Sequence, residues 1–200
     1  MSRILRNFVL VLLLAVAVGA GIALAASHDA PYTLKEWLGW SRFHRYDALI
    51  NQVAAKNKID PMLLKAVIWR ESAFDPEKLG REGERGLMQV SEAAASDWAG
   101  AQKTEPPAPD DLFDPTTNVE AGAWYLKRAL ANYSAKDDPI PFALAEYNAG
   151  RQRVNQWLGD DSAAPLTADQ FRKNISITST RKYVDTIEQR YQFYKNRGRM

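Results

Sequence analysis

The sequence predicts an all-α protein, in which one compact helical domain, residues 42–197, follows an N-terminal apolar segment. Three observations support this fold class. Apolar residues recur three and four positions apart in several stretches, as on the buried face of a helix. Helix-start signals such as Asp60-Pro61 precede these stretches. No run alternates between apolar and polar residues as a strand would, apart from residues 175–178, which we interpret as the lead into a final helix.

Residues 1–26 have the pattern of a signal peptide or signal anchor. Arg3 and Arg6 precede an uncharged, mostly apolar run from Phe8 to Ala26, and positive charge before such a run is typical of export. Ala23-Leu24-Ala25 fits a cleavage site, but the run is also long enough to span a bilayer, so cleavage and retention both stay open. We expect the rest of the chain to act in the periplasm or cell envelope. If the segment is retained, residues 8–26 anchor it to the inner membrane.

Composition argues against several functional classes. The net charge of +2 over 200 residues is too small for nucleic-acid binding through bulk electrostatics. The chain has no cysteine, which excludes disulfides, thiolate metal sites and cysteine nucleophiles. Its only histidines, His28 and His44, are too few for a histidine-rich metal site. We therefore expect no metal, no cofactor and no nucleic-acid partner.

Apolar residues at helical spacing and helix-capping residues predict the first two helices of the domain. Residues 27–41 are expected to be a linker and the start of a first helix, which the pattern places at residues 33–56. A second helix should begin at Asp60-Pro61 and end near Phe74, because the residue before Pro76 avoids helical geometry. Each helix carries one buried stripe: Tyr46, Leu49, Ile50 and Val53 in the first, and Leu64, Val67 and Ile68 in the second.

The downstream elements follow from the same signals. Loops are expected at residues 77–85, 102–111 and 160–167, where glycine, proline and polar residues break the periodicity. Helices are expected at residues 91–99, from 114–115 through 133, at residues 141–150 and 153–158, and from a cap at 179 or 180 through 194.

Glu71 is the most informative residue, because it continues the apolar stripe of the second helix. A carboxyl group held against an apolar wall keeps its proton to unusually high pH, which suits proton donation. The alternative is an ordinary structural role, in which Glu71 pairs with Arg70 or Arg81. Burying an unpaired carboxylate is costly, so its place on the stripe favours function.

Two further motifs carry polar groups beside helix ends. In Gly86-Leu87-Met88-Gln89, the glycine would permit close approach to a ligand, and Gln89 offers both a donor and an acceptor. The alternative is a turn with Leu87 and Met88 in the core. Residues 145–150 end a helix at a glycine cap and place Tyr147 and Asn148 in its last turn, where they could orient a carboxylate or bind a sugar.

Together these motifs resemble the lytic transglycosylases with the soluble-lytic-transglycosylase (SLT) catalytic domain, a family with a goose-lysozyme-like helical fold. The resemblance spans residues 46–195. It is carried, in order, by Glu71-Ser72 with Phe74, Gly86–Val90, Asn118 with Gly122, Tyr125 and Leu126, Ala145–Gly150, and Thr180-Arg181 with Tyr183-Val184.

The resemblance implies cleavage of the β-1,4 bond between N-acetylmuramic acid and N-acetylglucosamine in peptidoglycan glycan strands. Glu71 would be the sole catalytic carboxylate, closing the muramoyl residue into a 1,6-anhydro sugar without a cofactor. Tyr147 would hydrogen-bond and orient Glu71. The resemblance also implies a monomeric catalytic domain at residues 42–197, and a substrate-binding set of Met88, Gln89, Asn148, Gly86 and Tyr125.

Two departures from the family pattern leave alternatives open. Gly80 stands where many members have a serine, in an unusually charged loop, and Glu146 stands where a small residue is common. Glu82, Glu84 or Glu146 could then serve as the second carboxylate of a hydrolytic muramidase, unless these are solvated charges or partners of Arg81 and Arg85. A third reading is a catalytically weak wall-binding protein that clears space for an envelope complex.

Overall fold

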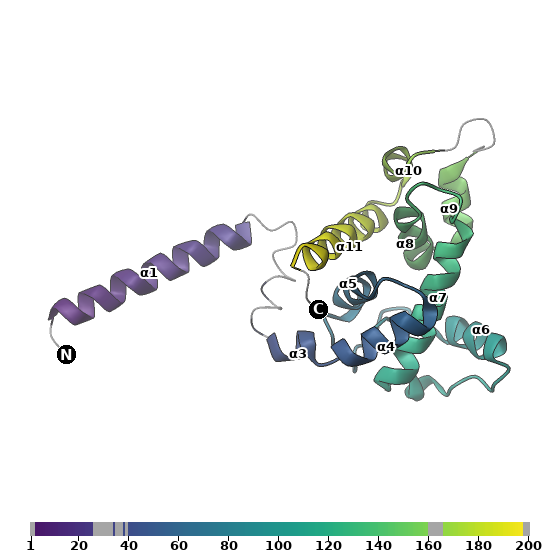
Figure 1. Ribbon diagram of the computed structural model, residues 1–200, viewed down its shortest axis with the longest axis horizontal. Helices are drawn as coiled ribbons and strands as arrows, with labels where there is room; N and C mark the ends of the chain where they lie inside the picture. The colour runs from purple at the N-terminus through teal and green to yellow at the C-terminus, as the bar shows by residue number, and fades with distance from the viewer. Residues whose placement is uncertain (1–2, 26–33, 35–37, 39, 160–165, 198–200) are drawn as a thin grey trace. The chain divides into compact units, whose positions relative to one another are not determined.

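The computed structural model describes residues 3–25, 34, 38, 40–159 and 166–197. The chain divides into two compact units, Met1–Trp40 and Ser41–Met200. Within the described residues every regular element is helical (Figure 1), and the only β pairing consists of two isolated bridges, Leu79 with Arg85 and Arg85 with Val90. The predicted all-α class is confirmed.

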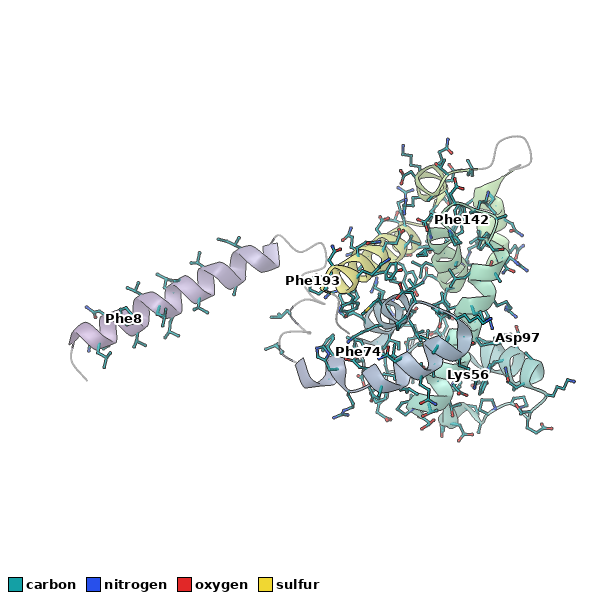
Figure 2. All side chains as sticks on the ribbon, viewed as in Figure 1. Phe8, Lys56, Phe74, Asp97, Phe142 and Phe193 are labelled. Carbon is teal, nitrogen blue, oxygen red and sulfur yellow. The ribbon has the colours of Figure 1, made fainter. Side chains whose placement is uncertain are left out.

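The first unit contains α1 (Arg3–Ala25). Residues Leu5–Ile22 have a mean hydropathy of 2.2 over 18 residues, so the helix is long and apolar enough to cross a membrane. None of this window is buried, and Phe8 lies on this helix (Figure 2). The helix is consistent with a signal or an anchor. Most of the predicted linker lies outside the described residues.

The helix predicted at residues 33–56 is interrupted. Its described part contains α3 (Trp40–His44) and α4 (Asp47–Asn57), separated by a turn at residues 45–46. The restart has a tertiary cause: the Asp47 carboxylate accepts from Lys65 Nζ at 2.6 Å and bonds His44 Nδ1 at 2.9 Å. Lys65 is 1% exposed, so this ion pair fixes the first turn of α4 against α5.

Helix α5 (Pro61–Ser72) begins as predicted, because the Asp60 side chain accepts from the Met62 N–H at 2.9 Å. It ends two residues before Phe74. Ala73 and Phe74 adopt positive φ values of 51° and 62°, a left-handed conformation that stops the helix. The stripe Leu64, Val67 and Ile68 is fully buried, as predicted.

The remaining helical elements of the second unit are α6 (Glu92–Gln102), the 3-10 helix η1 (Pro109–Phe113), α7 (Pro115–Asn132), α8 (Ile140–Ala149), α9 (Arg151–Leu158), α10 (Ala168–Asn174) and α11 (Thr178–Arg197). Helix α6 continues past Gly100, because the left-handed cap falls at Lys103. Neither α10 nor η1 was predicted from the sequence. Helix α10 is short. Its buried Phe171 packs against α8, where its ring stacks on that of Phe142 with the ring centroids 4.2 Å apart (Phe142 is labelled in Figure 2).

The packing brings three helix ends together. Helix α11 packs against α5 and α8, and α8 also packs against α7, as Figure 1 shows. These contacts place the last turn of α5, which carries Glu71, near the last turn of α8 and the first turns of α11. The loop at residues 73–90 runs from α5 to the cap of α6 and borders the same region.

Candidate functional site

Glu71 lies at the end of the buried stripe of α5 and opens onto a cavity of about 550 Å³. Its Oε1 atom accepts a hydrogen bond of 2.5 Å from the hydroxyl of Tyr183 on α11. Burial raises the pKa of Glu71 to about 7, against lowering by the Tyr183 hydrogen bond and by the charges of Lys78 and Arg70. Among the described residues no ion pair joins Glu71 to Arg70 or Arg81. The ion pair of the structural alternative is therefore not found in this part of the chain, and the proton-donor role of Glu71 stays a prediction.

Two adjoining cavities form the walls of the site. The larger lies between residues 78–84, Gln89 and the end of α8, with Tyr147 and Asn148 in its lining. The smaller, about 230 Å³, extends over α6 and α7 toward Asp97 and Tyr125. Glu84, Gln89 and Tyr147 line both cavities, so the two form one elongated cleft beside Glu71.

Tyr147 does not make the hydrogen bond predicted for it. Its hydroxyl donates to the backbone oxygen of Met88 at 3.0 Å, whereas Tyr183 donates to Glu71. Burial and the neighbouring charge of Glu71 both raise the pKa of Tyr147, which keeps its phenol protonated as a donor. Its ring meets Tyr125 edge-on at 5.7 Å. Tyr147 thus holds the Met88 backbone by a hydrogen bond and lines the cleft. The residue that hydrogen-bonds Glu71 directly is Tyr183.

Gly86 and Met88 are scaffold residues in this structure, not cleft surface. A Cβ atom at Gly86 would lie 2.5 Å from both Asn118 Nδ2 and the Leu112 oxygen, so the absence of a side chain permits close packing against these protein atoms. Met88 is fully buried against Gly122, where a Cβ would lie 2.6 Å from the Met88 sulfur. The burial of both residues matches the core alternative, and their substrate contacts stay predictions.

Asn118 joins this loop to α7. It is fully buried; its Oδ1 accepts from the Met88 N–H at 2.8 Å, and its Nδ2 donates to the oxygens of Arg85 and Leu112 at 2.7 Å each. Two backbone groups of the loop and one of η1 are thereby satisfied by one side chain. The sequence showed Asn118 only as part of the family pattern, without indicating this role.

Gln89, Asn148 and Tyr125 keep access to the cleft. Gln89 has a positive φ of 50°, and its Nε2 donates to the oxygens of Lys78 and Gly86 at 3.0 and 3.1 Å. Those bonds fix its amide and direct Oε1 toward Gly80. Asn148 is exposed, and its Oδ1 accepts from the Thr180 hydroxyl at 2.7 Å. Both amides are therefore held in place beside the cavity.

The structure separates the three candidate second carboxylates. Glu146 is 3% exposed and accepts from the Tyr133 hydroxyl at 2.6 Å and from Asn132 Nδ2 at 2.9 Å, so its role is structural. Glu82 is exposed at the rim of the larger cavity, and Glu84 lines both cavities. In the part of the chain that the structure describes, no group of three or more acidic or histidine side chains is placed to hold a metal ion.

Comparison with known proteins gives the same assignment as the fold and site. The model of the Transglycosylase SLT domain matches residues 48–169. The soluble lytic murein transglycosylase of Escherichia coli (strain K12) is 31% identical over 143 residues, covering 71% of this chain and 22% of that protein. Membrane-bound lytic murein transglycosylase F of Desulfosudis oleivorans is 30% identical over 145 residues, covering 71% of this chain and 28% of that protein.

Solved structures share the fold. The lytic transglycosylase Slt of Pseudomonas aeruginosa, as an inactive mutant, aligns with a TM-score of 0.70 at 25% identity, covering 77% of this chain and 24% of that one. The 70 kDa soluble lytic transglycosylase of Escherichia coli aligns with a TM-score of 0.68 at 29% identity, covering 76% and 24%. This chain spans about a quarter of the length of these relatives. The chain belongs to the Transglycosylase SLT domain family and is homologous to the soluble lytic murein transglycosylases.

Proposed function

We propose that this protein is an exported peptidoglycan lytic transglycosylase, with residues 42–197 as its catalytic domain. It cleaves the β-1,4 bond between N-acetylmuramic acid and N-acetylglucosamine and leaves a 1,6-anhydro-muramoyl end. The observation that carries this proposal is Glu71: an acid whose pKa is raised to about 7, in a cleft whose lining includes the neutral hydrogen-bonding groups of Gln89, Tyr147 and Asn148. The related Pseudomonas aeruginosa structure is an inactive mutant in which a glutamate is replaced by glutamine.

In the first step Glu71 acts as general acid. Oε1 is held by the Tyr183 hydroxyl, so the proton is carried by the other oxygen, which donates it to the glycosidic oxygen. The bond to C1 of the muramoyl sugar breaks as the leaving hydroxyl forms. The substrate's own N-acetyl group stabilises the positive centre, so this step does not require a second carboxylate.

In the second step the Glu71 carboxylate acts as base. It removes the proton from the C6 hydroxyl of the muramoyl sugar while that oxygen bonds to C1 and closes the anhydro ring. The nucleophile is part of the same sugar, so positioning rather than water activation drives the step. The Tyr183 hydrogen bond and the charges of Lys78 and Arg70 stabilise the carboxylate between the two steps.

The cleft supplies the sugar subsites. Gln89, Asn148 and Tyr125 are the proposed substrate-binding residues, and Tyr147 lines both cavities. Gly86, Met88 and Asn118 pack together in the protein interior and fix the loop at residues 73–90. The glycan strand of peptidoglycan is the proposed partner of a monomeric catalytic domain, which needs neither cofactor nor nucleic acid.

Export is proposed from α1. Residues 1–26 act as a signal peptide or anchor that directs the domain to the periplasm or cell envelope, and residues 8–26 hold it at the inner membrane if they are retained. Residues 27–41 would then connect the anchor to the catalytic domain.

The products of peptidoglycan digestion test this proposal. The full chain in detergent should release disaccharide-peptides lighter by one water than the products of hydrolysis, and the Glu71→Gln protein should release none. Muramic acid with a free reducing end would instead establish a hydrolytic muramidase. Wall binding without any product would leave the wall-binding interpretation, against which the intact pairing of Glu71 with Tyr183 already argues.

The Tyr183→Phe variant should shift the pH dependence of the reaction. In the wild type, activity should fall as pH rises through about 7, because Glu71 loses the proton that it must donate. The hydrogen bond from Tyr183 lowers the pKa of Glu71, so its loss should move this decline to higher pH. We also expect kcat to fall about tenfold, because the carboxylate intermediate loses a charged hydrogen bond.

Tyr191→Phe is the matched control for this experiment. Tyr191 lies on the same helix, but its hydroxyl donates to the Asp60 cap at 2.7 Å and not to Glu71. That variant should lose some stability and keep the wild-type pH profile. Identical pH profiles for Tyr183→Phe and Tyr191→Phe would contradict the assigned role of Tyr183.

A further inference from the structure

We propose that Glu84 is a substrate-binding carboxylate, which accepts a hydrogen bond from an N–H or O–H group of the sugar bound beside Glu71, in space that Gly80 leaves open. This inference deepens the proposed function and rests on it for the identity of the ligand. It gives a role to a loop carboxylate whose role the sequence alone left open.

The structural basis is the pairing of Gly80 with Glu84 across a tight turn. The Gly80 N–H donates to the Glu84 backbone oxygen at 2.7 Å. A Cβ atom built at Gly80 would lie 2.1 Å from Glu84 Oε2 and 3.2 Å from Glu84 Cβ. The Glu84 carboxylate therefore occupies the volume that any other residue type at position 80 would fill. The Glu84 carboxylate can therefore take this position only because residue 80 has no side chain.

The Glu84 carboxylate has unused bonding capacity. Within the described chain its Oε2 accepts a hydrogen bond from the Glu82 N–H at 3.2 Å, whereas a carboxylate can accept about four. Arg81 and Arg85 were the two predicted ion-pair partners. Arg85 is engaged elsewhere, since it donates to the Gly83 oxygen at 2.9 Å and pairs with Glu92 at 3.1 Å. No ion pair of Glu84 occurs among the described residues.

The position of Glu84 suits a sugar donor. Glu84 lines both cavities, beside Tyr147 and Gln89. Gln89 Oε1 lies 2.9 Å from the same point above Gly80, so two acceptor oxygens converge there, while Gln89 Nε2 is committed to backbone oxygens. Amino sugars present N-acetyl N–H and hydroxyl donors that match such acceptors. The charge of Glu84 also raises the pKa of Glu71 and so helps it to stay protonated before catalysis.

Binding without turnover is the primary test. The full chain carrying Glu71→Gln is titrated by calorimetry with a soluble tetrasaccharide of alternating N-acetylglucosamine and N-acetylmuramic acid. Adding Glu84→Ala should weaken binding about tenfold or more, because a hydrogen bond to a charged group is lost. Adding Glu84→Gln should weaken it less, since one acceptor oxygen remains. Glu77→Ala, an exposed glutamate in the same loop that lines neither cavity, should leave affinity unchanged.

A double substitution tests the shared space. In the same Glu71→Gln background, Gly80→Ser should weaken binding when Glu84 is present, because its side chain displaces the carboxylate. With Glu84→Ala it should instead improve binding, because the serine hydroxyl then fills the vacated space as an acceptor. The sign of the Gly80→Ser effect should therefore reverse. Effects of Gly80→Ser and Glu84→Ala that simply add would overturn the shared-space argument.

The other outcomes separate this inference from the proposed function. Unchanged affinity for Glu84→Ala, in a protein that unfolds at the wild-type temperature, overturns the inference. It is also overturned if the enzyme releases reducing-end muramic acid and Glu84→Gln abolishes that product with binding intact, since Glu84 would then activate water. If no anhydro product forms but Glu84→Ala still weakens binding, the proposed function fails and the substrate contact of Glu84 stands.

Discussion

Replacing Glu71 with glutamine should reduce release of anhydro-disaccharide products by a factor on the order of 10³ or more, because the reaction loses both its acid and its base. Glutamine has nearly the same shape and can still accept the 2.5 Å hydrogen bond from Tyr183, so the cleft should keep its geometry and its affinity for glycan. Product release by mass spectrometry and glycan binding by calorimetry measure the two effects separately. Turnover within tenfold of wild type would show that Glu71 is not the acid.

The same substitution should stabilise the protein at neutral and higher pH. The pKa of Glu71 is raised from 4.5 to about 7 by burial, so between these values the folded state binds more protons than the unfolded state. Wild-type stability therefore falls as pH rises from 4.5 to about 7, and the deficit persists above pH 7. We expect Glu71→Gln to be more stable by an amount on the order of 1 kcal/mol above that range.

Thermal unfolding at pH 4 and at pH 8 tests the stability effect. The difference between wild type and Glu71→Gln should be present at pH 8 and should vanish below pH 4.5, where Glu71 is protonated in both states. Glu77→Gln, on the exposed loop, should give no comparable gain. Equal unfolding temperatures for wild type and Glu71→Gln at pH 8 would mean that burying the charged carboxylate does not destabilise the folded state.

Local signals predicted most helix starts. The caps Asp60, Ser91 and Asp114 each accept from a backbone N–H of their own first turn, and such pairings depend on a few neighbouring residues only. The break between α3 and α4 could not be predicted in this way, because the Lys65 side chain that fixes it comes from another helix. Helix α10 was missed because only Phe171 among its residues is buried, too few for a periodic signal.

The sequence indicated which residues belong to the candidate site, but not which of them contact one another. Glu71 could be found because the stripe of α5 ends on it, which is a local pattern. Its hydrogen-bond partner Tyr183 is 112 residues away and shares its helix with other tyrosines, so the sequence offered no reason to prefer it over Tyr147. The pairing of Glu84 with Gly80 likewise depends on how the turn closes, which residue order does not reveal.

The Asn118→Ala variant should destabilise the fold by about 3 kcal/mol or more, because it leaves buried backbone groups without partners. The Met88 N–H and the oxygens of Arg85 and Leu112 all bond this one side chain, which is fully buried. Chemical denaturation of the full chain measures the loss. Asn155→Ala, which truncates an exposed asparagine on α9, should change stability by no more than about 0.5 kcal/mol.

Hydrogen exchange locates this effect in the loop. The Met88 amide should exchange much faster in Asn118→Ala than in wild type, since its acceptor is gone, whereas amides inside α11 should follow only the global stability. Asn118→Asp keeps the Oδ1 acceptor for Met88 but loses the Nδ2 donor, so it should protect the Met88 amide and still be destabilised. A Met88 amide that stays fully protected in Asn118→Ala would mean that Asn118 does not hold the loop. Other contacts would then have to fix the position of Gln89 and of the Met88 backbone oxygen, which accepts from the Tyr147 hydroxyl.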